Sequence, residues 1–181
     1  MRLEQRRRIQ VPLVPSEGTA IPADAPADAP DEQLRAFLAR PLRPLRGLLD
    51  PARLQAAAGD RYLYRSRPYA VAGWILQPHV TLHALWDGER LTIRQLEARV
   101  EGLGEWQERL QFGLEASIWP LAAGLEAQAR VWAEVPAAAA PLAAPVLGLA
   151  LQQLLDRLER RCQRGLRRRA EAWLSQPARA A

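Results

Sequence analysis

The chain has 181 residues, of which 49% are hydrophobic and 25% are charged. This length and composition suit one globular domain over residues 1–181, and they are not typical of a disordered chain. No run reaches the roughly 18 uncharged apolar residues that a membrane-spanning helix needs, so we expect no transmembrane segment. The N-terminus is rich in arginine but has no apolar core after it, so it does not resemble a signal peptide.

Cysteine usage indicates the cellular compartment, and arginine usage indicates how much weight the positive charge of the chain deserves. Cys162 is the only cysteine, which excludes an intrachain disulfide and a zinc site with several thiolates and favours a reducing, cytoplasmic location. All 25 basic residues are arginine, and the chain contains neither Lys nor Asn. Such usage is typical of a GC-rich genome, so the arginines and the net charge of +5 are by themselves weak evidence for phosphate binding.

The N-terminal part of the chain predicts one strand and two short helices. Residues 8–14 alternate and predict the strand, and residues 16–30, rich in Ala, Pro and Asp, predict a flexible linker loop. Asp31 can cap a short helix that ends before Pro41, and a second short helix follows from Pro44.

Strand patterns dominate the middle of the chain. Residues 62–67 predict a strand, and residues 80–86 alternate clearly between two faces. Asp87-Gly88 follows at once and precedes the apolar residues 91–93, which together form a strong hairpin signal.

Two longer alternating runs follow the hairpin. The chain turns at residues 102–104, alternates over 110–118, turns at 120–124 and alternates again over 125–135. Strands joined by short turns are antiparallel, and one-sided alternation indicates that one face of the sheet is covered.

The covering element is a long C-terminal helix. Residues 136–145 predict an Ala/Pro connector, and residues 146–174 carry apolar side chains at helical spacing. About 29 residues at 1.5 Å each give a rod of roughly 43 Å, long enough to cross a sheet. Gly165 allows a close approach or lets the end fray, and we expect the grip to loosen there because Arg169 falls on the apolar side. The apolar face consists of Leu147, Leu151, Leu154, Leu155, Leu158, Cys162 and Trp173.

This order of elements resembles the helix-grip fold of the START-like (SRPBCC) superfamily, which includes lipid-transfer, pathogenesis-related and polyketide-cyclase-like proteins. The fold class that follows is α+β, with an antiparallel sheet wrapped on one long C-terminal helix and two short helices after the first strand. Cavities in this fold class hold lipids, sterols or pigments, so the resemblance implies a ligand of this kind for any internal cavity.

A narrower resemblance is carried by three segments. Residues 34–41 (LRAFLARP) and 48–53 (LLDPAR) are followed by residues 60–62 (DRY) and by a spaced set beyond them. Over about residues 6–175 they resemble a START-like family of cyanobacteria and plant chloroplasts with unassigned function. That family often has a Met- or Phe-rich segment where this chain has residues 70–76 (AVAGWIL). The resemblance implies that the protein belongs to a photosynthetic cell and is located in the cytoplasm. A peripheral position on the thylakoid membrane is one form of this expectation. The spaced set consists of Arg67-Pro68, Gln77-Pro78, Val80, Leu82 and Trp86.

Small inward-facing residues support a cavity opposite the helix. Alanines recur on the predicted inner strand faces, and Arg67 could bind the carboxylate or phosphate of a ligand. Two alternatives stay open: large side chains such as Trp119 fill the space, and Arg67 pairs with an acid at the rim of the sheet. The candidate lining residues are Arg67, Ala84, Trp86, Phe112, Ala116, Ala127, Ala129 and Val131, and Ala133 is a further small inward residue.

The C-terminal helix also carries a basic stripe. The five arginines of this stripe fall within an arc of about 100° on a helical wheel, apart from the apolar face. A further side carries Asp156, Glu159, Gln152 and Gln163, and we expect it to be ordinary surface. The stripe is either a solvated surface or a contact for an acidic protein or an anionic membrane. We expect no nucleic acid, because aromatic residues do not interleave with the arginines. The basic stripe consists of Arg157, Arg160, Arg161, Arg164 and Arg168.

Catalytic and metal-binding patterns are weak. His79 and His83 lie about 13 Å apart along one strand, so they cannot share a metal ion. Four acids cluster around a turn, where carboxylates are usually solvated rather than paired for acid–base work. We therefore predict no catalytic residue, no metal and no cofactor, with cyclase-like activity as a third reading. The acids are Glu97, Glu101, Glu105 and Glu108.

Two functions are expected from these features. The first is a non-enzymatic protein that binds or chaperones a small hydrophobic ligand, a lipid or pigment, in a photosynthetic cell. The alternative is an interaction or assembly factor that places its basic stripe on an acidic partner or an anionic membrane surface.

Overall fold

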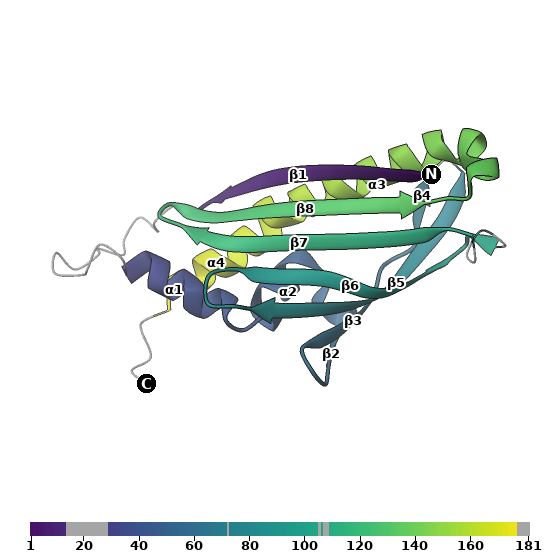
Figure 1. The fold of residues 1–181 in the computed structure, drawn as a ribbon. Coiled ribbons are helices and arrows are strands. Elements are labelled where there is room, and N and C mark those ends of the chain that lie inside the picture. The colour runs from purple at the N-terminus through teal and green to yellow at the C-terminus, as the bar shows by residue number, and fades with distance from the viewer. Residues whose placement is uncertain (14–28, 72, 105, 107–108, 177–181) are drawn as a thin grey trace.

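The computed structural model describes residues 1–13, 29–71, 73–104, 106 and 109–176. Within these residues eight strands form one antiparallel sheet of order β1-β8-β7-β6-β5-β3-β2, with β4 added on β5 (Figure 1). The strands are β1 (Arg2–Pro12), β2 (Leu54–Ala57), β3 (Arg61–Arg65), β4 (Tyr69–Val71), β5 (Trp74–Trp86), β6 (Leu91–Glu101), β7 (Gln111–Leu121) and β8 (Gly124–Glu134). The helices are α1 (Ala29–Leu38), α2 (Leu42–Leu48), α3 (Ala140–Arg161) and α4 (Arg167–Leu174), with the short turns η1 (Pro51–Arg53), η3 (Ala137–Ala139) and η4 (Cys162–Leu166).

The predicted α+β architecture is confirmed. The sheet wraps on the long C-terminal helix, which runs behind β1 and β8 and reaches α1 at its far end (Figure 1). Two short helices follow the first strand, as predicted. The segment 16–30 lies almost wholly outside the described residues, so the linker stays a prediction. Among the helices of the described residues, none has the length and apolarity to cross a membrane.

The predicted hairpin at Asp87-Gly88 is confirmed and joins β5 to β6. The Asp87 carboxylate accepts the backbone N–H groups of Glu89 and Arg90, each at 2.9 Å, which fixes the turn. Gly88 has φ +99°, a value that side-chain-bearing residues rarely adopt.

Several strands are longer than predicted, because hydrogen bonding to the full length of a neighbouring strand outweighs the local effect of residues that usually end a strand, such as proline. β1 starts at Arg2 rather than residue 8, since it pairs with β8 along its full length. β5 starts at Trp74, so Pro78 lies inside it, where the Pro78 carbonyl accepts the N–H of Ser66. Pro120 likewise belongs to β7, and the predicted turn at 120–124 shrinks to the residues between Leu121 and Gly124.

β6 and β7 separate along part of their length. Their pairing runs only over residues 91–94 of β6 and 115–118 of β7. Further along β6 a bulge opposite Thr81 and Leu82 leaves Leu96 52% exposed. The Gln95 side chain donates from Nε2 to the carbonyl oxygen of Phe112 at 2.6 Å, which satisfies an acceptor next to the opening. The sheet therefore opens at one end.

The C-terminal helix begins at Ala140, six residues before the predicted start, so the second half of the 136–145 segment is helical. Pro145 lies inside the helix, where it lacks the N–H that would donate to the carbonyl of Pro141.

The helix then continues through the π-helical turn η4 into α4. We predicted that its packing on the sheet would loosen near Gly165, and this prediction is wrong. Leu166 and Ala170 are both 0% exposed, whereas Arg169 faces solvent. A π turn holds one residue more than an α turn, so it rotates everything after it around the axis by about 100°. This rotation turns Arg169 away from the sheet.

Gly165 is the point of a close backbone approach, which decides between the two readings of this glycine. A Cβ atom at position 165 would lie 2.1 Å from the carbonyl oxygen of Gly47 in α2. A Cβ at position 47 would lie 2.8 Å from the Cα of Leu166. α2 and η4 therefore pack backbone to backbone.

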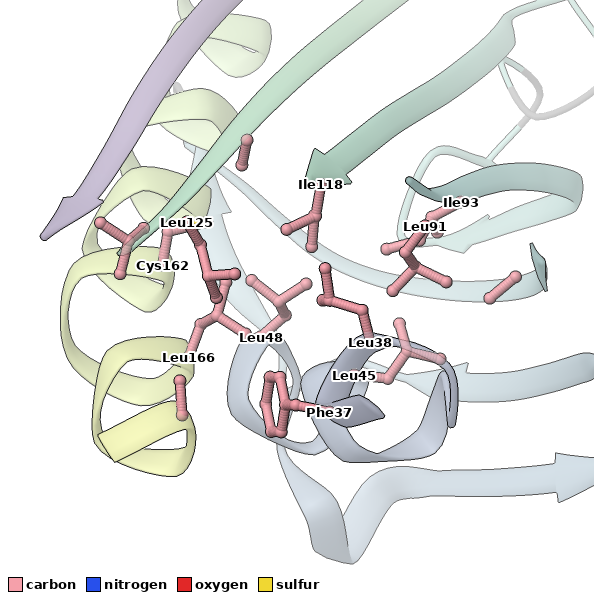
Figure 2. Packing of buried hydrophobic residues seen from close by; sticks show 14 of the residues in the cluster. Phe37, Leu38, Leu45, Leu48, Leu91, Ile93, Ile118, Leu125, Cys162 and Leu166 are labelled. Carbon is pink, nitrogen blue, oxygen red and sulfur yellow. The ribbon is translucent and has the colours of Figure 1, made fainter. Parts of the chain in front are cut away.

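This contact belongs to a tightly packed cluster, which we call the packed half. Figure 2 shows Leu38 of α1 and Leu45 and Leu48 of α2 pointing toward strand residues, while Phe37 of α1 lies between the helices on the side of Leu166. Figure 1 places this cluster where α1, α2 and α4 gather at one end of the sheet. The packed half includes Ile9, Val11, Leu34, Phe37, Leu38, Leu45, Leu48, Tyr62, Leu82, Ala84, Leu91, Ile93, Ile118, Leu125, Ala127, Cys162, Leu166 and Ala170.

The buried thiol in the packed half gives a pH-dependence prediction. Burial raises the pKa of Cys162 from 9.0 to about 12, and Glu159 adds to the shift. Since the folded state holds the proton more tightly than the unfolded state, this residue contributes stability that is fully present below pH 9 and is lost as the pH rises toward 12. In urea unfolding between pH 8 and 11, we expect Cys162→Ala to reduce the alkaline loss of stability. An unchanged alkaline slope would contradict the shifted pKa.

Candidate functional site

A cavity of about 780 Å³ lies between α3 and the inner face of the sheet. Its position follows from how the helix sits, because α3 packs directly on β1 and β8 while β5, β6 and β7 lie further along the curved sheet. The separation of β6 from β7 widens the sheet over the same region. The cavity therefore occupies the half of the grip away from α1 and α4.

The walls of the cavity are mainly apolar. Small residues face it from both sides, with Ala98 and Ala116 on the sheet and Ala143 and Ala150 on α3. Such residues leave space that larger side chains would fill. The larger wall residues include Leu76, Val80, Val100, Leu103, Trp106, Leu110, Phe112, Leu114, Trp132, Leu147, Leu151, Leu154 and Leu158, together with Leu45, Leu48, Leu82 and Ile93 of the packed half, where the two regions meet.

The lining also includes charged side chains, four of them exposed arginines, and together with Tyr69 we call these residues the mouth. It comprises Asp50, Arg67, Tyr69, Arg157, Arg160 and Arg161, all of which line the cavity. The Arg157 guanidinium lies 4.6 Å from the centre of the Tyr69 ring, a cation–π contact that orients it. Burial raises the pKa of Tyr69 and the nearby Arg157 offsets part of this shift, so the hydroxyl stays protonated at neutral pH.

Arg67 pairs with an acid, which agrees with one of the two alternatives stated from the sequence. Its Nε and Nη2 donate to the Asp50 carboxylate at 3.2 and 3.1 Å. Burial opposes ionisation of Asp50, but hydrogen bonds from the Ala52 N–H and from Arg67 outweigh it, and the pKa of Asp50 lies below its ordinary value. The Arg67 charge is thus compensated within the protein.

The five arginines of the basic stripe are exposed but divide into two groups. Arg157, Arg160 and Arg161 line the cavity, whereas Arg164 and Arg168 lie further along the helix on the surface. Among the residues that the structure describes, no acid forms an ion pair with any of the five.

The opposite, acidic side of the helix is not ordinary surface, which corrects the sequence-based expectation. Arg7 points from β1 toward α3, where its Nη1 bonds to Asp156 and lies 2.8 Å from Glu159. Hydrogen bonding to Asp156 raises the pKa of Arg7 above its ordinary value. Gln5 adds a bond from Nε2 to the carbonyl oxygen of Gly148 at 3.2 Å. The acidic side therefore fastens the helix to the edge strand.

The predicted lining residues separate into three groups. Arg67, Phe112 and Ala116 line the cavity. Ala84 and Ala127 lie in the packed half, with Trp86 packed against it. Ala129 and Val131 are buried in a second cluster beneath α3, together with Ala133. Small residues on β8 thus bring the helix close to the sheet, and only those on the neighbouring strands leave space.

Several lining residues were missed by the sequence reasoning. Trp106 and Leu103 lie in the connection between β6 and β7, and Tyr69 and Trp74 lie at the β4–β5 hairpin. Leu103 lies inside the predicted turn at 102–104, where its apolar character was an available signal, because residues of exposed loops are usually polar.

The candidate titratable groups do not converge on the cavity. His79 lies with its Nε2 3.1 Å from Glu101 at the sheet surface, whereas Glu105 and Glu108 are outside the described residues. The described residues contain no group of three or more His, Cys, Asp or Glu able to hold a metal ion. Within that part of the chain Asp50 is the sole carboxylate of the cavity lining, and Arg67 occupies it.

Comparison with known proteins gives a weak likeness only. The sequence matches no protein-family model and no curated protein. A crystal structure of a Thermus thermophilus protein has 14% identity and a TM-score of 0.48, over 97% of this chain and 100% of that one. A START superfamily protein from Mycobacterium smegmatis has 13% identity and a TM-score of 0.37, over 89% and 96%. A Thalictrum norcoclaurine synthase point mutant, in complex with a transition-state analogue, has 10% identity and a TM-score of 0.42, over 90% and 93%. At these values the likeness adds nothing to what the topology establishes.

Proposed function

We propose that this protein binds a small hydrophobic ligand in the cavity between α3 and the sheet. The observation that carries the proposal is the cavity itself, with about 780 Å³ of space between apolar walls. Sites for small molecules typically enclose about 300–1,000 Å³ and combine apolar walls with a few placed polar groups. This cavity has both features.

The arrangement of the two halves supports binding rather than chemistry. The packed half fixes one end of the helix, so the cavity walls are held apart by a rigid frame. Acid–base catalysis requires titratable groups placed against the substrate, and the described carboxylate of the lining is engaged by Arg67. We therefore propose a non-enzymatic role, binding or chaperoning the ligand.

The finer identity of the ligand and setting rests on the sequence resemblance. A lipid or pigment in a photosynthetic cell, with a cytoplasmic place near the thylakoid membrane, stays a prediction of that resemblance. The size and the apolar walls of the cavity are consistent with such a ligand.

A second candidate is an interaction role for the basic stripe. The observation that favours it is the exposure of Arg164 and Arg168, which lie outside the cavity without an acidic partner among the described residues. An acidic protein or an anionic membrane surface would compensate these charges. Under this role, Arg164→Glu together with Arg168→Glu abolishes a salt-sensitive association.

Binding is tested with the neutral fluorescent probe phenylnaphthylamine. We expect saturable binding by the wild-type protein and at least about tenfold weaker binding by Ala116→Phe, because the added ring occupies cavity space. Ala172→Phe, an exposed position on α4, is the matched control and should bind as the wild type does. The proposal fails if the folded wild-type protein binds no probe, or if both variants bind it equally well.

A further inference from the structure

We propose that the cavity selects an amphiphile with one anionic head group, a carboxylate or a phosphate monoester at the end of an alkyl chain. The inference rests on the proposed hydrophobic-ligand function and adds the chemistry of the head group. Its basis is the place of three arginines at the mouth.

The charges at the mouth are unbalanced. Four arginines and one aspartate line the cavity among its described residues. Arg67 and Asp50 neutralise each other through two hydrogen bonds. Arg157, Arg160 and Arg161 therefore leave a positive charge beside an apolar space.

The helix places these arginines next to the tail site. Arg157 and Arg161 are one turn apart, and Leu154 and Leu158 lie on the same face at spacings of three and four residues. Leu158 lies between Arg157 and Arg161, so aliphatic and cationic side chains are direct neighbours on this part of the cavity wall. An extended amphiphile with its chain against Leu154 would present its head group to the arginines.

The side-chain chemistry favours an oxyanion over a neutral polar head. Guanidinium groups donate two parallel hydrogen bonds to carboxylate or phosphate, and their contacts with anions are stronger than those with neutral acceptors. The low dielectric of an adjoining apolar cavity strengthens this attraction. Arg157 is already oriented by its contact with Tyr69 at 4.6 Å, which reduces the loss of side-chain freedom on binding.

Arg164 and Arg168 provide an internal comparison. Both are exposed arginines of the same continuous helix, but they do not belong to the described lining of the cavity. If a general positive field attracted the anion, every arginine of the stripe would contribute to its binding. A head-group site instead depends on the arginines at the mouth.

The test is displacement of phenylnaphthylamine by four competitors: dodecanoate, dodecyl phosphate, dodecanol and inorganic phosphate. We expect dodecanoate or dodecyl phosphate to displace the probe at about tenfold lower concentration than dodecanol, and inorganic phosphate to be ineffective. The two anionic competitors distinguish a carboxylate site from a phosphate site. Arg160→Gln with Arg161→Gln should weaken this preference, because only Arg157 of the three arginines remains, and Arg164→Gln with Arg168→Gln should keep it in full.

Each contrary result has a separate meaning. If the probe binds but dodecanol competes as well as the anions do, the head-group inference is wrong and the proposed function stands. Equal losses in both double variants also overturn the inference, because they indicate a diffuse field. If neither probe nor amphiphile binds the folded protein, the proposed function itself fails.

Discussion

Replacing Gly165 with alanine is expected to destabilise the protein by about 2 kcal/mol, although alanine favours helices by about 1 kcal/mol over glycine. The new Cβ would lie 2.1 Å from the Gly47 carbonyl oxygen and 3.1 Å from its carbon. Both are backbone atoms, so the conflict is relieved only by moving α2 away from the π turn. Such a movement would disturb the packed half. The free energy of unfolding in urea measures the effect.

Gly148→Ala is the matched control for this prediction. Gly148 lies in the same continuous helix, and nothing approaches within 4 Å of a Cβ placed there. The same chemical change should therefore stabilise the protein by about 0.5–1 kcal/mol. The close approach of α2 to the helix would be refuted by a Gly165→Ala variant as stable as Gly148→Ala.

The second large effect is expected from Leu166→Ala, at about 3–5 kcal/mol. The Leu166 side chain is 0% exposed and contributes to the packed half, where neighbours from α2 and the strands surround it. Removing it leaves a void whose lining loses packing contacts. Leu154→Ala is its counterpart on the same helix, at a half-buried position on the cavity wall. We expect it to cost about 1–2 kcal/mol, because Leu154 already faces empty space on one side.

Urea unfolding of the two leucine variants compares the two halves of the grip. A larger loss for Leu166→Ala supports one packed and one hollow half. Equal losses would mean that Leu154 is as closely surrounded as Leu166, which contradicts the cavity.

The architecture was predictable because its signals are local. The Asp87-Gly88 turn between alternating runs fixed one hairpin, and the long apolar face of the last helix required a sheet to cover. The ends of the strands were less predictable. β1 begins at Arg2 because it pairs with β8 there, although no local residue pattern indicates a strand before residue 8. Pro78 and Pro120 lie inside strands for the same reason.

The position of the cavity was not predictable from alternation. Alternation tells which side chains point inward, but not how far the helix lies from each strand. Ala129 on β8 and Ala116 on β7 therefore gave the same signal, although the first lies buried beneath α3 and the second faces the cavity. The separation of β6 from β7 also depends on a bulge that no residue pattern announced.

The helical wheel was a sound guide up to the π turn and misleading after it. It grouped Arg157, Arg160 and Arg161 correctly, because they precede Cys162. It placed Arg169 on the apolar face, because a wheel assumes constant helical rotation. The wheel also could not show that Arg7 of the distant first strand pairs with Asp156 and Glu159.

The most direct test of a ligand site in the hollow half is methyl NMR of the protein titrated with dodecanoate. With leucine methyl groups assigned, we expect the largest saturable shifts at Leu114, Leu154 and Leu158, which line the cavity. The methyl groups of Leu34, Leu38 and Leu166 in the packed half should change little. Shifts confined to the packed half, or to exposed residues such as Leu85 and Leu121, would contradict a ligand held between α3 and the sheet.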